Sequence, residues 1–415
     1  MTPSLAGFNP GAVQVGLDAL AATESPLRPL VERLRGGRVG LLAHAASVDR
    51  RYRHAVDVLV ELGATPVTLF GPEHGFGGAA QDMIGVGDAV DPRTGARVVS
   101  LYGDEADDLV PKASDLEPLD VLVIDLVDVG ARYYTYVWTA LIAAREAAKV
   151  DTHVVILDRP NPIGDRIEGR TVDAGFGSFV GYEPVPIRHG LTLGTMAALH
   201  LASDGVALGP EGAVSVVGVR GLPVGALASA WDRPFVLPSP NMPTFDTALV
   251  YPGGCLLEGT NLSEGRGHTR PFEIWGAPWL DGAALAEQLA GTGLPGVTCR
   301  PLSFIPTFHK HGGKVCGGVQ VHVTDVDTFR PVATYVALIA LARRQDPERF
   351  AFRTERYEYI DHIPAFDLLT GSPQAREAIE AGEPARDIAE MVSRVSPAWT
   401  SRKADAAEAL VTASW

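Results

Sequence analysis

The stretch TLFGPEHGFGGAA, residues 68–80, places a carboxylic acid and an imidazole side by side, as Glu73 and His74. The pair follows a short apolar run, residues 66–70, that is typical of a buried strand and ends at a Gly-Pro step. A carboxyl group and an imidazole can both donate and accept protons, so the pair suits general acid–base chemistry. The structural alternatives are a helix cap for Glu73 and a simple hydrogen bond for His74.

Two further strand-like segments also end in polar side chains. At the end of the DVLVID segment and just after it are Asp125, Asp128, Arg132 and Tyr133. After the HVVIL segment come Asp158, Arg159 and Asn161. Because the carboxyl ends of parallel strands meet at one edge of a sheet, we expect these side chains to converge there as an active site. The alternative is that the aspartates form turns or pair with a neighbouring arginine.

Residues 234–272 are rich in Pro, Gly, Asn and Thr, which predicts an unusually long loop. Loops of that length are usually functional or linkers, and this one is not of low complexity. It carries Asn241 and then a dense group of hydrogen-bonding side chains between glycines: Glu258, Asn261, Glu264, Arg266, His268, Thr269 and Arg270. We interpret this group as part of a binding site; a solvated surface loop is the alternative.

The elements that must position these residues alternate between strand and helix. Strands are predicted near 37–46, 66–70, 96–103 and 120–130, and again at HVVIL; helices are predicted near 54–63 and at YVWTALIAAREAA. This alternation indicates an α/β fold with a Rossmann-like, doubly wound, mostly parallel sheet. A second unit follows, with a helix at 280–290, a strand at 318–325 and a helix at 332–344. We expect a catalytic domain over 25–275 and a smaller α+β domain over 276–415.

Composition excludes several classes of protein. The chain has 415 residues, a net charge of −15 and a pI near 5.2, so we expect it to repel nucleic acid and anionic membranes. Three scattered cysteines argue against a disulfide framework and favour a reducing compartment. The N-terminus does not resemble a signal peptide and no apolar run is long enough to span a membrane, so a cytoplasmic location is the expectation.

Cofactor motifs are weak or missing. Residues 75–80 match the dinucleotide pattern G-x-G-x-x-A, but the following residues are poorly helical and the Glu73 carboxylate would repel a pyrophosphate. The chain has no Walker A lysine and no G-x-S-x-G elbow. The spacing of His309, His311, Cys316 and His322 fits no standard zinc site. We therefore expect neither a metal nor a nucleotide cofactor; a non-catalytic sugar- or peptide-binding protein is the competing class.

Long motifs from residue 37 to the C-terminus are more specific. In order they are LFGPEHGF, DVLVIDLVDVGARYYTY, ILDRPNPIGD, SFVGYEPVPIRHGLTLGTMA, PSPNMPTFDTALVYPG, LLEGTNLSEGRGHTRPFEIWGAPW and FIPTFHKHGGKVCGGVQVHVTD. Together they closely resemble the exo-β-N-acetylmuramidase family, long catalogued as a domain of unknown function. The resemblance implies hydrolysis of non-reducing terminal β-1,4-linked N-acetylmuramic acid from peptidoglycan fragments. It also implies a site between a Rossmann-like domain and a smaller C-terminal one. Family members often carry an export signal, which this chain does not show.

The resemblance also suggests roles for the candidate residues. Glycoside hydrolysis needs a proton for the leaving oxygen, which Glu73 would supply while His74 orients it or contacts the sugar. If the 2-acetamido group attacks the anomeric carbon, the polarising carboxylate is one of Asp125, Asp128, Glu258 and Glu264. An arginine fork suits the lactyl carboxylate, and the candidates are Arg132, Arg159, Arg266 and Arg270. Hydroxyl and acetamide contacts fall to Asn161, Asn241, Asn261 and Thr269, with Tyr133 as an aromatic platform. The second catalytic group, the stereochemistry and the oligomeric state are left open.

Overall fold

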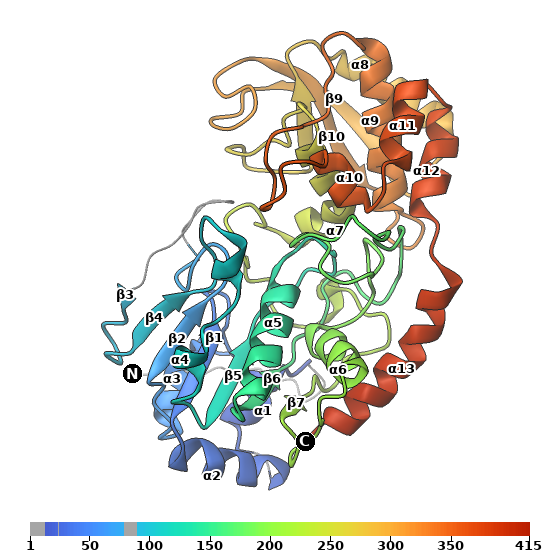
Figure 1. The fold of residues 1–415 in the computed structure, drawn as a ribbon. Helices are drawn as coiled ribbons and strands as arrows, with labels where there is room; N and C mark the ends of the chain where they lie inside the picture. The colour runs from blue at the N-terminus through green and yellow to red at the C-terminus, as the bar shows by residue number, and fades with distance from the viewer. Residues whose placement is uncertain (1–12, 24, 79–88) are drawn as a thin grey trace.

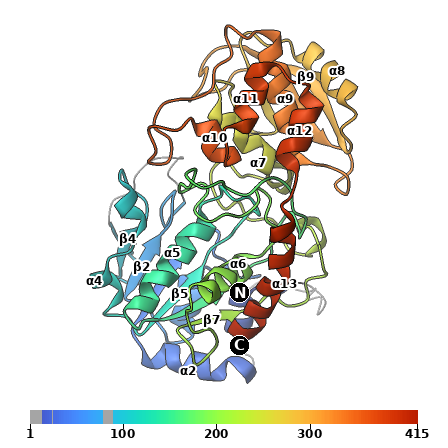
Figure 2. The same cartoon turned by 45° about the vertical axis from the view of Figure 1, so that its right-hand side comes forward.

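The computed structural model describes residues 13–23, 25–78 and 89–415. One part of the molecule is built on a seven-stranded sheet and the other on a three-stranded sheet, and helices pack on both (Figures 1 and 2). The predicted architecture, a Rossmann-like domain followed by a smaller α+β domain, is confirmed. Within the described ranges, no helix is long and apolar enough to cross a membrane.

The large sheet is parallel except at one edge. Its order is β3-β4-β2-β1-β5-β6-β7, and only β3 runs antiparallel to its neighbour. The strands are β1 (Val39–Ala43), β2 (Thr68–Gly71), β3 (Ala89–Val90), β4 (Arg97–Ser100), β5 (Val121–Asp125), β6 (His153–Leu157) and β7 (Val214–Val217). The chain winds outward through β2 and then returns past β1 to β5. The switch point therefore lies between β1 and β5, and the carboxyl ends of β1, β2, β5 and β6 share one edge, as predicted.

Alternation along each central strand divides its side chains between two hydrophobic cores. In β5, Val121 and Val123 pack under α1, α2 and α3, whereas Leu122 and Ile124 pack under α5 and α6. Both sets are buried, which is why the strand is apolar throughout and lacks a polar face.

The helices of the large part form two layers around this sheet (Figure 1). They are α1 (Gly16–Ala21), α2 (Arg28–Gly36), α3 (Ala55–Glu61), α4 (Ala113–Leu116), α5 (Tyr136–Lys149) and α6 (Leu193–Ser203). Short 3₁₀ turns lie at Ser25–Leu27, Ala106–Leu109 and Ala228–Ala230. The helices predicted near 54–63 and from Tyr136 onward are confirmed as α3 and α5.

The smaller part has an antiparallel sheet in the order β8-β10-β9. Its strands are β8 (Ile274–Ala277), β9 (Val297–Phe304) and β10 (Cys316–Val323). Its helices are α8 (Gly282–Thr292), α9 (Pro331–Gln345), α10 (Ala365–Thr370), α11 (Gln374–Ala381) and α12 (Ala385–Ser393). The three predicted elements of this part correspond to α8, β10 and α9.

The expectation of a continuous loop over 234–272 is wrong. A helix, α7 (Phe245–Gly254), and a 3₁₀ turn at Cys255–Gly259 lie inside it. Thr244 caps α7, because its side chain accepts a hydrogen bond from the backbone of Thr247 at 3.2 Å. The Pro-Gly-Gly end of α7 looks like a loop, yet it serves packing: a Cβ at Gly253 would lie 2.1 Å from the carbonyl oxygen of Pro331 in α9. Tertiary contact thus overrides the local preference.

The last helix, α13 (Pro397–Ala413), leaves the smaller part and packs on α6 and β7 of the large part (Figure 2). The chain then adds a short parallel bridge, in which the backbone N–H of Trp415 donates to the carbonyl of Val216 at 3.1 Å. The C-terminus therefore lies beside the large sheet, and the two parts are joined by two crossings of the chain.

Buried polar side chains fasten the two parts together. Arg132 of the large part donates to the carbonyl of Leu369 in α10 at 2.6 Å. Glu168 accepts a hydrogen bond from the backbone N–H of Ala333 in the first turn of α9 at 2.9 Å. Burial raises the pKa of Glu168 to about 7, although the hydrogen bond from the Ala333 backbone and the charge of Arg188 oppose the shift.

This shift predicts a pH-dependent stability. The folded chain holds the Glu168 proton more tightly than the unfolded chain. Protonated Glu168 therefore adds to the free energy of unfolding in full below pH 4.5, and this stabilisation is lost as the pH rises to about 7. The Glu168→Gln variant removes this group, so we expect the stability difference between wild type and variant to fall by about 3 kcal/mol over that range. Urea unfolding at pH 4.5 and pH 8 measures it, with the exposed Glu348→Gln as the charge-matched control. An unchanged difference would contradict the prediction.

Candidate active site

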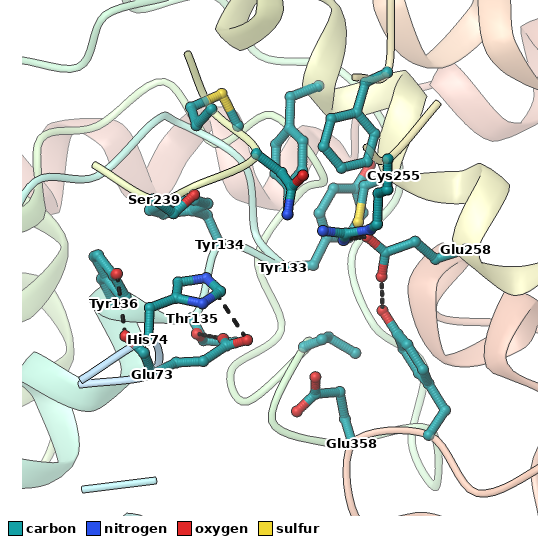
Figure 3. A pocket seen from close by; sticks show the side chains of 17 residues that line it. Glu73, His74, Tyr133, Tyr134, Thr135, Tyr136, Ser239, Cys255, Glu258 and Glu358 are labelled. Atoms are coloured by element: carbon teal, nitrogen blue, oxygen red, sulfur yellow. Dashed lines mark hydrogen bonds and ion pairs between the residues drawn. The ribbon is translucent and has the colours of Figure 1, made fainter. Parts of the chain in front are cut away.

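A pocket opens between the two parts of the chain, on the side where β2 and β5 end (Figure 3). It contains about 560 Å³ of space including its open mouth. The lining mixes acids, hydroxyls and aromatic rings: Glu73, His74, Tyr133, Tyr134, Thr135, Tyr136, Val180, Ser239, Asn241, Met242, Tyr251, Cys255, Glu258, Arg266, Phe272, Tyr357 and Glu358.

Glu73 lies in the turn that follows β2 and is only 7% exposed. Its Oε2 accepts a hydrogen bond from the hydroxyl of Thr135 at 2.8 Å, and its Oε1 lies 3.8 Å from Nε2 of His74. His74 has a φ of +68°, a backbone conformation that is uncommon outside glycine and is often found at functional sites. The acid is therefore held at a fixed place with an imidazole directly beside it.

Tyr136, at the start of α5, supports this turn. Its hydroxyl lies 3.1 Å from the carbonyl of Glu73 and 3.2 Å from that of Pro238, so it links the acid's turn to the segment that carries Ser239 and Asn241. His44, at the end of β1, packs edge-on against the Tyr136 ring at 4.9 Å. Burial and the nearby Arg159 lower the pKa of His44, so the imidazole is neutral near pH 7.

A charged cluster forms the opposite wall. Arg266 donates to Glu258 at 2.6 Å and to Glu264 at 3.0 Å, and it lies over the ring of Phe272. Lys310 contacts the other oxygen of Glu264 at 3.0 Å. Burial alone would favour the protonated acid, but the two cations outweigh it and lower the pKa of Glu264 to about 2. The carboxyl group of Glu264 is therefore ionised near neutral pH.

The residues predicted from sequence divide between the pocket and its surroundings. Those that line the pocket are Glu73, His74, Tyr133, Asn241, Glu258 and Arg266, and those that do not are Asp125, Asp128, Arg132, Arg159, Asn161, Asn261, Glu264, Thr269 and Arg270. The second set lies outside for specific physical reasons.

Asp125 and Arg159 form a buried ion pair across the ends of β5 and β6. Both carboxylate oxygens of Asp125 accept from the guanidinium, at 2.5 and 2.8 Å. The pair lies at the edge of the sheet near the switch point, and each side chain neutralises the charge of the other.

Four more predicted residues contact the protein backbone or a histidine. Arg132 donates to three carbonyl groups, Asp128 accepts from the amide of Gly130 and lies 3.2 Å from Nε2 of His189, and Asn161 bonds the backbone at Ile163 and Leu191. Asn261 similarly bridges to residues 349 and 351. Their polar atoms hold loops in place.

Glu264 contacts Arg266, which lines the pocket, but does not line the pocket itself. Thr269 is exposed, and Arg270 is 40% exposed and paired with the exposed Asp246 and the buried Glu273. Thr269 and Arg270 are close to Arg266 in sequence but do not line the pocket with it. The chain turns away at Gly267, whose φ is +75°.

Sequence reasoning missed several lining residues. Thr135 and Ser239 had an available signal, since each stands within two residues of a predicted candidate. Tyr357 and Glu358 stand about 90 residues beyond the nearest candidate segment, and no pattern linked them to it. Only the approach of the two parts of the chain reveals them.

The structure does not support the dinucleotide motif over its described portion. Residues 73–78 form successive turns and do not begin a helix, and residues 79 and 80 lie outside the described ranges. In the part of the chain that is described, no three His, Cys, Asp or Glu side chains gather as a metal site.

Comparison with known proteins identifies the family. Residues 39–246 match the family model described as "Exo-beta-N-acetylmuramidase NamZ, N-terminal", and residues 249–406 match its C-terminal counterpart. This chain belongs to the exo-β-N-acetylmuramidase family. Over 387 residues it is 40% identical to the Peptidoglycan beta-N-acetylmuramidase NamZ of Bacillus subtilis (strain 168), covering 91% of this chain and 86% of that protein.

Solved structures support the same assignment. A DUF1343 family protein from Bacteroides fragilis NCTC 9343 superposes with a TM-score of 0.79 at 28% identity, over 98% of this chain and 99% of its own. A second DUF1343 protein from that strain gives a TM-score of 0.69 at 25% identity, over 96% and 98% of the two chains. The two-part architecture around the pocket is thus the family's fold.

The charged cluster predicts a large difference between two neighbouring arginines. Arg266→Met leaves Glu258 and Glu264 buried beside a reduced positive charge, so we expect a loss of about 3–5 kcal/mol in the free energy of unfolding. Arg270→Met should lose less, about 1 kcal/mol, because the Arg270 side chain is 40% exposed and its buried partner Glu273 keeps a hydrogen bond from Thr247. Urea unfolding at pH 7 compares the two variants, and equal losses would contradict the assignment of a buried charge cluster.

Proposed function

We propose that this chain is an exo-acting β-N-acetylmuramidase that releases the non-reducing terminal N-acetylmuramic acid from peptidoglycan fragments. The observation that carries the proposal is a buried carboxyl group, Glu73, fixed by Thr135 in a pocket lined with hydroxyls and aromatic rings. Family membership supports the same reaction. In this reaction Glu73 gives its proton to the glycosidic oxygen, since a carboxyl group held in place beside the bond can act as a general acid.

His74 and Thr135 contact Glu73 and would keep its carboxyl group oriented toward the bond that breaks. The aromatic wall, Tyr133, Tyr134 and Tyr251, offers apolar ring faces to a pyranose. Asn241 and Ser239 place amide and hydroxyl groups on the same wall for the sugar's polar substituents.

We assign the lactyl carboxylate to Arg266. Of the four arginines with the chemistry to bind it, only Arg266 lines the pocket. Its guanidinium is held in place by Glu258 and Glu264, and such preorganisation favours a planar, two-point contact with a carboxylate.

We place this activity in the cytoplasm, acting on imported muropeptides. All three cysteines, Cys255, Cys299 and Cys316, are free thiols, and burial raises the pKa of each. Free thiols suit a reducing compartment. Cell fractionation with an antibody to the chain tests the location, and recovery with the exported proteins would contradict it.

The first test is release of N-acetylmuramic acid from a MurNAc–GlcNAc disaccharide by wild type and by Glu73→Gln. We expect the variant to be slower by a factor of about one hundred or more, because the departing sugar hydroxyl needs a proton. Thermal unfolding confirms that the variant is folded. A folded wild type that binds the disaccharide without cleaving it would reject the hydrolase and favour a sugar-binding protein.

The second test concerns the lactyl group. Arg266→Lys keeps the charge but removes the planar fork, so we expect KM for a chromogenic N-acetylmuraminide to rise roughly tenfold with a smaller change in kcat. Wild type should not turn over the matching N-acetylglucosaminide, which lacks the carboxylate. Equal KM values for variant and wild type would remove Arg266 from this role.

A further inference from the structure

A second acid reaches the pocket from the smaller part of the chain. Glu358 lies at the tip of a tight hairpin in which Tyr357 and Ile360 exchange backbone hydrogen bonds of 2.8 and 3.0 Å. Both tip residues, Glu358 and Tyr359, have positive φ, at 45° and 71°. A two-residue turn of this kind usually contains Gly or Asn. Residues of another type are strained in this left-handed conformation, so Glu and Tyr are held there by the surrounding contacts.

The hairpin is anchored on both sides of Glu358. On one side, the hydroxyl of Tyr357 donates to Glu258 in the charged cluster at 2.7 Å. On the other, the hydroxyl of Tyr359 donates to the carbonyl of Gly103, beyond β4 of the large part, at 3.1 Å. Its ring packs edge-on against Tyr102 at 5.9 Å. Glu358 is thereby held at the junction of the two parts, only 7% exposed, with its side chain lining the pocket.

Glu358 and Glu73 face the same region. Figure 3 shows their carboxyl groups turned toward one side of the pocket, from different segments of the chain. The hydroxyl of Tyr102 lies 3.5 Å from Oε2 of Glu358. Burial, and after it the acids Glu73 and Glu358, raise the pKa of Tyr102. The third acid of the pocket, Glu258, is instead engaged by Arg266 and Tyr357.

We propose that Glu358 is the second catalytic carboxylate, which accepts the proton of the group that attacks the anomeric carbon. This inference rests on the hydrolase function proposed above. As Glu73 protonates the glycosidic oxygen and the C1–O bond breaks, an oxygen forms the new bond to C1. That oxygen belongs either to water or to the sugar's own acetamide. The proton released from the water O–H or the acetamide N–H passes to Glu358, so the two carboxyl groups exchange protonation states.

This role makes Glu358 distinguishable from Glu73 by the leaving group. The dinitrophenolate of a dinitrophenyl β-N-acetylmuraminide departs without protonation, so Glu73→Gln should lose less than about tenfold on this substrate but at least about one hundredfold on the disaccharide. Glu358→Gln should lose about one hundredfold or more on both substrates, because the attacking group needs its base whichever group departs. The matched control is Glu355→Gln, an exposed acid on the same hairpin, which should keep wild-type rates.

Chemical rescue supplies a readout that a structural role would not produce. Azide or formate added to Glu358→Ala should restore a measurable part of the rate on the dinitrophenyl substrate, and the same anions should not accelerate Glu355→Gln. Nuclear magnetic resonance of the first-formed sugar reports the stereochemistry: inversion indicates direct attack by water, and retention indicates a first attack by the acetamide or by a carboxylate. Thermal unfolding confirms that each variant is folded.

Two results would overturn the proposal while leaving the hydrolase intact. One is a Glu358→Gln rate within about threefold of wild type, and the other is a Glu358→Gln variant that regains its rate on the dinitrophenyl substrate as Glu73→Gln does. An inactive, folded wild type would instead reject the hydrolase itself.

Discussion

The arrangement of the pocket depends on one buried guanidinium. Arg132 is fully buried and donates to the carbonyl groups of Arg170, Val185 and Leu369, which come from three distant segments. Its own carbonyl accepts from the indole of Trp138 at 2.7 Å. Burial lowers the pKa of Arg132 only to about 10, so the group stays charged near pH 7, and a buried charge is tolerated only when hydrogen bonds satisfy it. Those carbonyl groups therefore have to stay where they are.

The next four residues carry the consequence. Tyr133 to Tyr136 leave the Arg132 anchor and enter α5, so the orientation of this short run is set from both ends. Thr135 then meets Glu73, Tyr136 meets its backbone, and the hydroxyl of Tyr133 donates to the carbonyl of Pro252 in α7. Arg132, whose charge would suit an anionic substrate, therefore does not line the pocket but fixes the position of the loop that does.

Charge is distributed across the pocket in a way that suits a substrate carrying one carboxylate. On one wall, two acids and two bases neutralise each other around Arg266. On the other, Glu73 and Glu358 are held by the hydroxyl groups of Thr135 and Tyr102. In the proposed reaction, an oxocarbenium-like centre is stabilised as Glu73 gives up its proton and becomes negative, and the lactyl group is assigned to the arginine. The acids arrive from different parts of the chain, so the joint between those parts sets their spacing.

The sequence by itself determined the order β1, α3, β2, β4, β5, α5 and β6, because burial on both faces of a parallel sheet leaves continuous apolar runs that local reading can recognise. It did not indicate α1, α2, β3 or α4. It also determined that Glu73 and His74 lie at the end of a strand, and the family. Only the tertiary structure decided which polar residues face the pocket. Asp125 and Arg159 lie at strand ends as expected, yet they pair with each other, because a buried charge without an opposite charge beside it is strongly destabilising. The helix α7 and the hairpin that carries Glu358 depend on contacts between residues far apart in sequence, and no local pattern encodes such contacts.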